Sequence, residues 1–232
     1  MSGAALGLLV AAGAGERLGV GVAKAFVEVA GQPLLAHAAR ALASAERIDA
    51  LVVVVAGEDV ERAGKALAEA GVQVRAVVQG GVERHESVAR GLEALGADDS
   101  VVAVHDAARP LATSALVSRT VGALVDPWAA VAPALPVVDT LKLADDAGRV
   151  IRTVDRRGVW AVQTPQVFPV DVLRSAHARI DARGLTDDLA LVERAGGRVR
   201  LVEGEHTNVK VTYPDDLELV AALLAARAGG QR

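Results

Sequence analysis

The chain has 232 residues, with 25 lysines and arginines against 29 aspartates and glutamates, so its formal net charge is −4. It contains no cysteine, which excludes disulfide scaffolds, cysteine-ligated metal sites and thiol nucleophiles. The slight acidity and an aromatic content of 2% argue against a nucleic-acid partner, because such binding uses basic patches or stacking aromatics. The length and the 52% of hydrophobic residues indicate a globular chain with a sizeable core.

The N-terminal stretch is uncharged and apolar as far as Gly15. It lacks a basic start, however, and it runs into glycines rather than a cleavage site. Elsewhere no uncharged apolar run approaches the roughly 18 residues that a membrane-spanning helix needs. We therefore expect a cytoplasmic protein with no membrane partner.

Short apolar runs alternate with helical patterns through the first half of the chain. We predict strands at 6–11, 51–56, 74–78 and 101–104, and helices at 33–45, 58–70, 83–95 and 113–125. Pro33 is expected in the first turn of its helix, and Thr113 is expected to cap the last one. Apolar strands separated by helices are typical of a parallel sheet covered on both faces, here an open doubly wound α/β sheet. Ligands of such sheets bind beyond the carboxyl ends of the strands.

The second half departs from this alternation. Segments 137–143 and 150–154 are strand-like and flank a polar tip, which predicts a projecting β-hairpin. Beyond it we predict helices at 170–182, 187–195 and 214–227, and strands at 199–203 and 209–211. We expect one domain over residues 1–228, which includes a hairpin arm at 136–159, followed by a frayed tail at 229–232.

A glycine-rich loop follows the first predicted strand. Gly13, Gly15 and Gly19 are spaced G-x-G-x-x-x-G, one residue too long for a dinucleotide-binding fingerprint, and no Walker A lysine follows. Backbone N–H groups of such a loop can hold phosphate, and Arg17 adds a charged fork. A simple tight turn is the alternative.

Charged residues follow two of these strand ends. Lys24 could place a point charge on a transferring phosphoryl group, although a solvated surface lysine is the better explanation of this residue taken alone. After the fourth strand, Asp106 is well placed to hold Mg²⁺ or a sugar hydroxyl, and Arg109 could clamp a phosphate. The alternative is that Asp106 caps a local turn and pairs with Arg109.

Other polar segments are weaker signals. Gly80 and Gly81 precede a helix that carries Ser87, Thr140 lies on the predicted hairpin, and Lys210 lies on a late strand. For each of them, a satisfied turn or a surface salt bridge explains the pattern equally well. The five histidines show no metal-ligand spacing, and no G-x-S-x-G elbow occurs, so a zinc site and a serine hydrolase are not indicated.

Taken together, these segments resemble the cytidylyltransferases of the non-mevalonate isoprenoid pathway, the 2-C-methyl-D-erythritol 4-phosphate cytidylyltransferases. The resemblance extends from about Leu8 to Leu219 and keeps the family's order. The matching segments are 11–19 with Lys24, 80–88, 105–110, 139–142, 153–156, 163–166, 186–188 and 208–212.

The resemblance implies a Rossmann-like nucleotidyltransferase fold and a homodimer whose active sites are shared through the hairpin arm. It implies transfer of CMP from CTP to 2-C-methyl-D-erythritol 4-phosphate, giving 4-diphosphocytidyl-2-C-methyl-D-erythritol and pyrophosphate. The substrate phosphate would attack the α-phosphate of CTP in line, without a covalent enzyme intermediate. Mg²⁺, or another divalent cation, would bridge the triphosphate oxygens.

The resemblance also implies roles for particular residues. Arg17 and Lys24 would stabilise the transition state, while Lys210 and the partner subunit's Arg156 would hold the attacking phosphate. Asp106 lies where related nucleotidyltransferases hold Mg²⁺. The substrate-binding residues would be Ala11, Ala12, Gly13, Gly80, Gly81, Ser87, Asp106, Ala107, Arg109, Thr140 and Thr164.

Three positions depart from the family pattern. Ala23 and Ala25 flank Lys24 where the family usually has proline and glutamine, and Val82 stands where an acidic residue is frequent. Without the proline, we expect a more mobile loop before CTP binds.

Two alternative functions stay open. One is a cytidylyltransferase for another polyol phosphate such as ribitol 5-phosphate, although residues 107–109 with Thr140 favour methylerythritol. The other is a nucleotide-binding regulator without catalysis, against which the retention of all four predicted catalytic cations argues.

Overall fold

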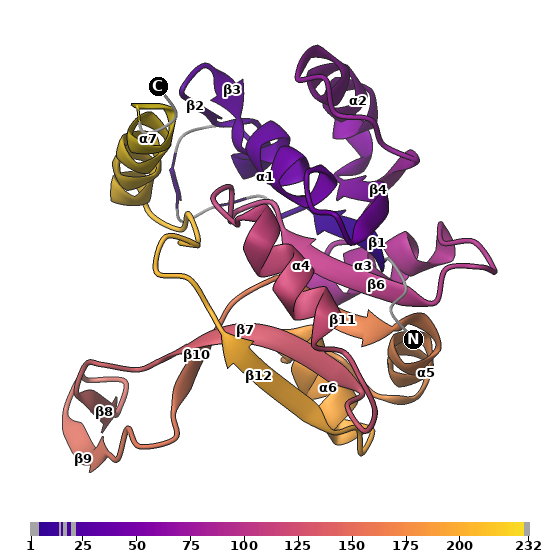
Figure 1. Cartoon of the computed structure of the whole chain (residues 1–232). Coiled ribbons are helices and arrows are strands. Elements are labelled where there is room, and N and C mark those ends of the chain that lie inside the picture. The colour runs from indigo at the N-terminus through magenta and orange to yellow at the C-terminus, as the bar shows by residue number, and fades with distance from the viewer. Residues whose placement is uncertain (1–4, 14, 16–17, 20–21, 230–232) are drawn as a thin grey trace.

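Figure 1 shows a twisted sheet with helices on both faces and a hairpin that projects from one end. This computed structural model describes residues 5–13, 15, 18–19 and 22–229. In that part, eight strands form the main sheet in the order β10–β7–β11–β6–β1–β4–β5, with β12 also paired to β7. They are β1 (Ala5–Val10), β4 (Ile48–Val55), β5 (Ala76–Gln79), β6 (Val101–Asp106), β7 (Ala130–Pro136), β10 (Trp160–Val162), β11 (Gln166–Pro169) and β12 (Val199–Glu203).

Most neighbours in this sheet are parallel, as the alternation of strands and helices predicts. β1 runs parallel to β4 and β6, β4 to β5, and β7 to β12. β10 and β11 run antiparallel to β7, and β11 is also antiparallel to β6. The predicted mostly parallel α/β sheet is therefore confirmed. The chain also forms a small two-stranded sheet from β2 (Glu28–Val29) and β3 (Gln32–Pro33).

Helices cover both faces of the sheet because each central strand is apolar on both sides. Ala5 and Leu9 of β1 join one core cluster, whereas Leu6 and Leu8 join the other. α1, α2 and α4 pack on the first face, α3, α5 and α6 lie on the second, and α7 lies near β2. The helices are α1 (Leu34–Ala43), α2 (Val60–Glu69), α3 (Arg84–Glu93), α4 (Ser114–Gly122), α5 (Val170–Arg179), α6 (Asp188–Arg194) and α7 (Pro214–Gly229), with short 3-10 helices η2 (Lys24–Phe26) and η3 (Gly57–Asp59).

Among the described helices, α4 and α6 begin at a residue whose side chain accepts a cap hydrogen bond. Thr113 caps α4 as predicted, since its hydroxyl accepts a hydrogen bond from the Leu116 N–H. Pro33 is the N-cap residue of α1 rather than its first helical residue. α3 begins with a capping box: the Glu83 side chain accepts from the backbone N–H of Glu86, and the Glu86 side chain accepts from the backbone N–H of Glu83. This box sets the direction in which α3 leaves the sheet edge.

Three expectations are corrected, and three strands of the main sheet had no counterpart among the predicted elements. The predicted strand at 209–211 does not form, because residues 204–213 run to α7 without joining a sheet ladder. β7, β10 and β11 were not expected, since prolines interrupt the pattern of β7 and the other two are short. The hairpin pairs only Leu141–Ala144 (β8) with Val150–Val154 (β9), so 137–140 stay outside its ladder. Gly229, expected in a frayed tail, is still helical in α7.

The β8–β9 hairpin forms a sheet of its own that projects from the main body (Figure 1). Several of its apolar side chains face solvent, among them Leu143, Val150 and Ile151, and Ile151 is 61% exposed. Singly exposed apolar residues are ordinary, whereas here several lie together on one projecting element.

In the part of the chain that the structure describes, we find no helix with both the length and the apolar character needed to cross a bilayer.

Gly91 of α3 lies against β1, and this contact sets the distance between helix and sheet. A Cβ atom there would lie 2.4 Å from Leu8 Cδ1, which is deep in the core. We predict that Gly91→Ala lowers the free energy of unfolding by about 1–3 kcal/mol, measured by urea denaturation. Gly64→Ala is the matched control, because Gly64 in α2 has no atom near its added Cβ and should gain about 0.5–1 kcal/mol. Equal effects of the two changes would contradict this packing.

Candidate active site

A pocket of about 590 Å³ lies at the carboxyl edge of the sheet. It opens between the ends of β1 and β6 and the start of α3, which is the edge where open α/β sheets bind ligands. Its lining residues are Val10, Ala11, Ala12, Gly13, Gly15, Lys24, Ala25, Val82, Glu83, Arg84, Ser87, Asp106, Ala107, Ala108 and Lys210.

Small residues bring the backbones of the pocket wall close together. A Cβ on Gly80 would lie 2.7 Å from both the Ala12 Cβ and the Ser87 Oγ. The Gly81 N–H donates to Ser87 Oγ at 3.1 Å, which ties the turn after β5 to the first turn of α3. Only glycine at position 80 allows this approach, and its own backbone groups are bound, the N–H to the Val55 carbonyl and the carbonyl by Arg90 NH1.

Asp106 is the central charge of the pocket, between Arg84 and Lys210. One of its carboxylate oxygens accepts from Lys210 Nζ at 2.7 Å, and the other accepts from Arg84 Nε at 3.2 Å. Burial alone would raise the pKa of this carboxyl, but the charges of Arg84 and Lys210 hold it well below its usual range. Asp106 therefore stays ionised at any pH near neutrality.

Arg84 joins this carboxylate to a second one behind it. Its NH1 donates to Asp188 Oδ2 at 2.5 Å, and Asp188 is only 2% exposed. Burial would lower the pKa of the guanidinium, but attraction to Asp188 and Asp106 outweighs burial and raises it. On the far side of Asp188, His177 Nε2 lies 3.3 Å from Oδ1.

A buried network holds the backbone of Asp106 from the other side. His105 is fully buried, with Nε2 3.1 Å from the Arg109 carbonyl and Nδ1 2.8 Å from Thr164 Oγ1. Because a carbonyl oxygen can only accept, Nε2 carries the proton, and Nδ1 of the neutral ring accepts from the Thr164 hydroxyl. The Asp106 N–H in turn donates to Thr164 Oγ1 at 3.2 Å. Burial lowers the pKa of His105 to about 4 and so keeps the ring neutral.

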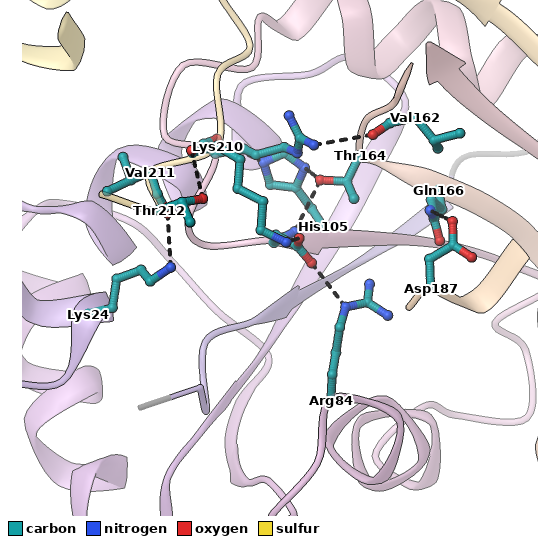
Figure 2. Close-up of polar contacts among 12 residues, drawn as sticks. Lys24, Arg84, His105, Val162, Thr164, Gln166, Asp187, Lys210, Val211 and Thr212 are labelled. Atoms are coloured by element: carbon teal, nitrogen blue, oxygen red, sulfur yellow. Dashed lines mark hydrogen bonds and ion pairs between the residues drawn. The ribbon is translucent and has the colours of Figure 1, made fainter. Parts of the chain in front are cut away.

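Lys24 reaches across the pocket from the 3-10 helix η2. Its Nζ donates to the Val211 carbonyl at 2.9 Å, so its ammonium lies beside the segment that carries Lys210 (Figure 2). Gly15 packs against this lysine, since a Cβ there would lie 2.6 Å from Lys24 Cβ. Gly15 also has a φ of 71°, in the left-handed region that favours glycine.

The structure brings eight of the predicted site residues together in the pocket wall, namely Ala11, Ala12, Gly13, Lys24, Ser87, Asp106, Ala107 and Lys210. Gly80 and Gly81 form the turn directly behind that wall. Thr140 and Arg156 lie beside the strands of the hairpin and do not line this pocket. Arg17 lies outside the described residues.

Two predicted substrate ligands are engaged inside the fold. Arg109 NH1 donates to the Asn208 carbonyl at 2.7 Å and NH2 to the Val162 carbonyl at 3.3 Å. Thr164 is 4% exposed and is hydrogen-bonded to His105. The suggested pairing of Asp106 with Arg109 is also replaced, because Arg84 and Lys210 hold the carboxylate instead. Direct contact of Arg109 or Thr164 with substrate stays a prediction.

Arg84 is the main pocket residue that the candidate set omits. It stands next to the predicted Gly-Gly turn, but its sequence neighbourhood resembles any polar first turn of a helix. Its importance follows from Asp106 and Asp188, which are 22 and 104 residues away in the chain. Only the fold reveals that these two carboxylates face the same guanidinium.

The open sheet, the glycine-rich turn and the cationic pocket at the carboxyl edge define an α/β nucleotidyltransferase. A family model described as IspD, 2-C-methyl-D-erythritol 4-phosphate cytidylyltransferase, matches residues 6–226. The chain belongs to this family, whose members are enzymes of cytidylyl transfer in isoprenoid biosynthesis. The resemblance seen in the sequence is therefore confirmed.

Individual proteins agree with the family model. The 2-C-methyl-D-erythritol 4-phosphate cytidylyltransferase of Nocardia farcinica is 47% identical over 226 residues, which cover 97% of this chain and 96% of that protein. A bifunctional enzyme IspD/IspF of Anaeromyxobacter dehalogenans is also 47% identical over 226 residues. That match covers 95% of this chain but only 57% of the bifunctional enzyme. The crystal structure of a 4-diphosphocytidyl-2C-methyl-D-erythritol synthase from Anaerococcus prevotii has a TM-score of 0.82 at 28% identity, with 97% of each chain covered.

The buried neutral His105 makes stability depend on pH. Its pKa falls from about 6.5 in the unfolded chain to about 4 in the fold, so the unfolded state binds more protons between these values. We predict that the contribution of His105 to the free energy of unfolding is complete above pH 6.5. It should fall by about 3 kcal/mol on acidification to pH 4.

Urea denaturation at pH 7, 5.5 and 4 measures this dependence. His105→Gln should flatten it, whereas His206→Gln, at an exposed histidine, should leave it unchanged. A His105→Gln protein with the slope of the parent would contradict the assignment.

Proposed function

We propose that the protein transfers CMP from CTP to 2-C-methyl-D-erythritol 4-phosphate, giving 4-diphosphocytidyl-2-C-methyl-D-erythritol and pyrophosphate. The observation that carries the proposal is the pocket of about 590 Å³ lined by Lys24, Arg84 and Lys210, in a chain of this family. Action in the cytoplasm is part of the proposal and stays a prediction.

The chemistry is one displacement at phosphorus. An oxygen of the methylerythritol phosphate forms a bond to the α-phosphorus of CTP, while the bond from that phosphorus to the bridging oxygen of the β-phosphate breaks. Pyrophosphate leaves with the electron pair of that bond. Negative charge spreads over the phosphoryl oxygens during the step, so the protein contributes mainly by positioning cations there.

The pocket cations suit this task because they are held before substrate arrives. Lys24 is anchored on the Val211 carbonyl, and Lys210 is anchored on Asp106. We assign Lys24 to the reacting α-phosphate and Lys210 to the attacking phosphate. Arg17, predicted to act beside Lys24, lies outside the described residues. We assign the cytosine base to the part of the pocket wall formed by Ala11, Ala12 and Ser87, with Gly80 behind it.

The residues of the pocket do not fit a metal ion held by the protein itself. Among the described residues, no three His, Cys, Asp or Glu side chains converge as a metal site would require. Asp106, the predicted ligand, is already shared between Arg84 and Lys210. We therefore derive no step through Mg²⁺, and the proposal keeps this ion only as a counter-ion carried by the phosphates of CTP.

The hairpin supports a homodimer with shared sites. It stands apart from the sheet, and its exposed apolar side chains offer a surface that a second copy can cover. Thr140 and Arg156 flank its strands, outside the pocket of their own subunit. We propose that they complete the pocket of the partner, where the partner's Arg156 helps Lys210 to hold the substrate phosphate.

The first test compares two alcohols. Pyrophosphate release is measured with CTP and Mg²⁺ in the presence of methylerythritol phosphate or of ribitol 5-phosphate. We expect release with methylerythritol phosphate alone. Release with ribitol 5-phosphate alone would keep the reaction but overturn the substrate, and CTP binding without any release would favour a regulator.

Lys24→Ala tests the assignment to the reacting phosphate. We expect kcat to fall about 10²–10³-fold, as for loss of one transition-state donor, with a much smaller change in the KM for CTP. Lys65→Ala is the matched control, because Lys65 is a lysine on the surface of α2 with a side chain 79% exposed. If kcat of Lys24→Ala stayed within a few-fold of the parent, this role would be wrong.

Subunit mixing tests the shared site. Arg156→Ala and Lys24→Ala homodimers should each be nearly inactive, since every site lacks one group. Mixed dimers contain one site with both groups intact, so mixing under exchange should restore part of the turnover. A mixture no more active than its separate components would contradict a site built from two subunits.

A further inference from the structure

Lys210 lies on a segment that no strand pairing holds in place. β12 ends at Glu203, α7 begins at Pro214, and the residues between them form no ladder with the sheet. The ion pair of Lys210 with Asp106 is a weak anchor by itself, because the lysine side chain is 42% exposed. Something else must fix the backbone from which this lysine reaches the pocket.

Asn208, two residues earlier, is the buried point of the segment. It is 0% exposed, and its Nδ2 donates to the Thr164 carbonyl at 2.9 Å and to Gln163 Oε1 at 3.2 Å. Both bonds are donated by Nδ2, while Oδ1 is buried without a hydrogen-bond partner among the described residues. The Nδ2 bonds therefore carry the anchoring, and their loss would leave the amide buried without any partner, which costs free energy. These bonds join the segment to the chain just after β10.

The side chain of Gln163 bonds the backbone of the same segment at Glu205. Its Nε2 donates to the Glu205 carbonyl at 2.8 Å, and its Oε1 accepts from the Glu205 N–H at 3.1 Å. A single side-chain amide thus satisfies both backbone groups of Glu205, as a neighbouring strand would. Gly204 leaves room for it, since a Cβ there would lie 2.7 Å from Gln163 Oε1.

Two further bonds close the segment around the lysine. Arg109 NH1 donates to the Asn208 carbonyl at 2.7 Å, and the Val211 N–H donates to the Ala108 carbonyl at 2.8 Å. Lys210 therefore stands between two anchored residues, Asn208 and Val211. Because the backbone on both sides of Lys210 is anchored, the directions in which its side chain can point are limited.

We infer that Asn208 is a positioning residue of the active site: its buried amide, held by Gln163 and Thr164, fixes the backbone that carries Lys210 to Asp106 and to the substrate phosphate. The inference rests on the proposed function for the role of Lys210 in turnover. Its structural part, that Asn208 places the Lys210 ammonium, stands without turnover. Displacement of a catalytic group by about 1 Å can cost about 10²-fold in rate.

Lysine acylation tests the structural part. The chain has four lysines, Lys24, Lys65, Lys142 and Lys210, so low conversion with acetic anhydride followed by peptide mass spectrometry resolves each one. In Asn208→Ala we expect the acylation of Lys210 relative to Lys65 to rise several-fold, because the ammonium loses its place beside Asp106. An unchanged ratio in a folded Asn208→Ala protein overturns the inference.

Two further variants complete this experiment. Gln163→Met keeps the side-chain length but removes the amide, so it should raise the ratio too and carries the test where Asn208→Ala does not fold. Thr120→Val is the matched control: it also removes a buried hydrogen bond, from Thr120 Oγ1 to the Leu116 carbonyl in α4, far from the pocket. It should leave the ratio unchanged, and an equal rise there would show general loosening and overturn the inference.

A double-mutant cycle tests the catalytic part. We expect Asn208→Ala to lower kcat/KM for methylerythritol phosphate by about 10²-fold, and the pair Asn208→Ala with Lys210→Ala to be no worse than Lys210→Ala alone, within about two-fold. A purely structural Asn208 would make the two losses multiply, which overturns the inference while the proposed function holds. A parent protein without turnover would instead overturn the proposed function, and acylation would still decide the placement of Lys210.

Discussion

The pocket depends on one carboxylate that two cations share. Asp106 stands at the end of β6, and its oxygens bind Arg84 from α3 and Lys210 from the segment before α7. This single side chain thereby joins three parts of the chain that are distant in sequence. Loss of Arg84 would leave the largely buried Asp106 with an uncompensated charge, which costs more than the pair contributes. The half-exposed Lys210 is held less firmly by this ion pair, so its place depends on the backbone that carries it.

The segment that contains Asp106 divides its polar groups between two environments. Asp106 faces the pocket, whereas His105 and Arg109 face the interior and bind Thr164 and backbone carbonyls. His105 and Asp106 point to opposite sides because successive side chains of a strand alternate between its two faces. His105 and Arg109 fix the backbone at this point, so Asp106 is held in its position at the pocket before a ligand binds. Rigid support of this kind favours electrostatic catalysis, because the cations do not reorganise during the reaction.

The sequence predicts the central sheet well and the second half of the fold less well. Apolar runs such as 51–56 are recognisable because they are buried on both faces, and the site follows from the rule that ligands bind at the carboxyl edge. β7 escapes detection because Pro133 and Pro136 break its pattern. The predicted strand at 209–211 fails for a different reason: the backbone of Val211 bonds the Ala108 carbonyl and the Lys24 side chain rather than a neighbouring strand, and such contacts have no local signature.

Arg84 and Asn208 illustrate the same limit within the site. Both lie in segments that resemble the family, 80–88 and 208–212, but their partners come from distant parts of the chain. The local sequence therefore does not show what either residue holds in place. By contrast, Lys24 and Asp106 adjoin loops that the sequence marks with glycine or with a strand end. Sequence reasoning therefore finds groups that face a ligand more readily than groups that hold other residues in place.

The projecting hairpin ties the proposed chemistry to the amount of protein present. A subunit whose pocket is completed by its neighbour works only while the two are associated, so specific activity should decline on dilution below the dissociation constant of the pair. Under the proposed sharing, a copy damaged in its hairpin would disable its neighbour's pocket while its own pocket stayed complete. A copy damaged in both its pocket and its hairpin would disable both sites of a mixed dimer, so only such a copy would remove more function than its share of the total protein.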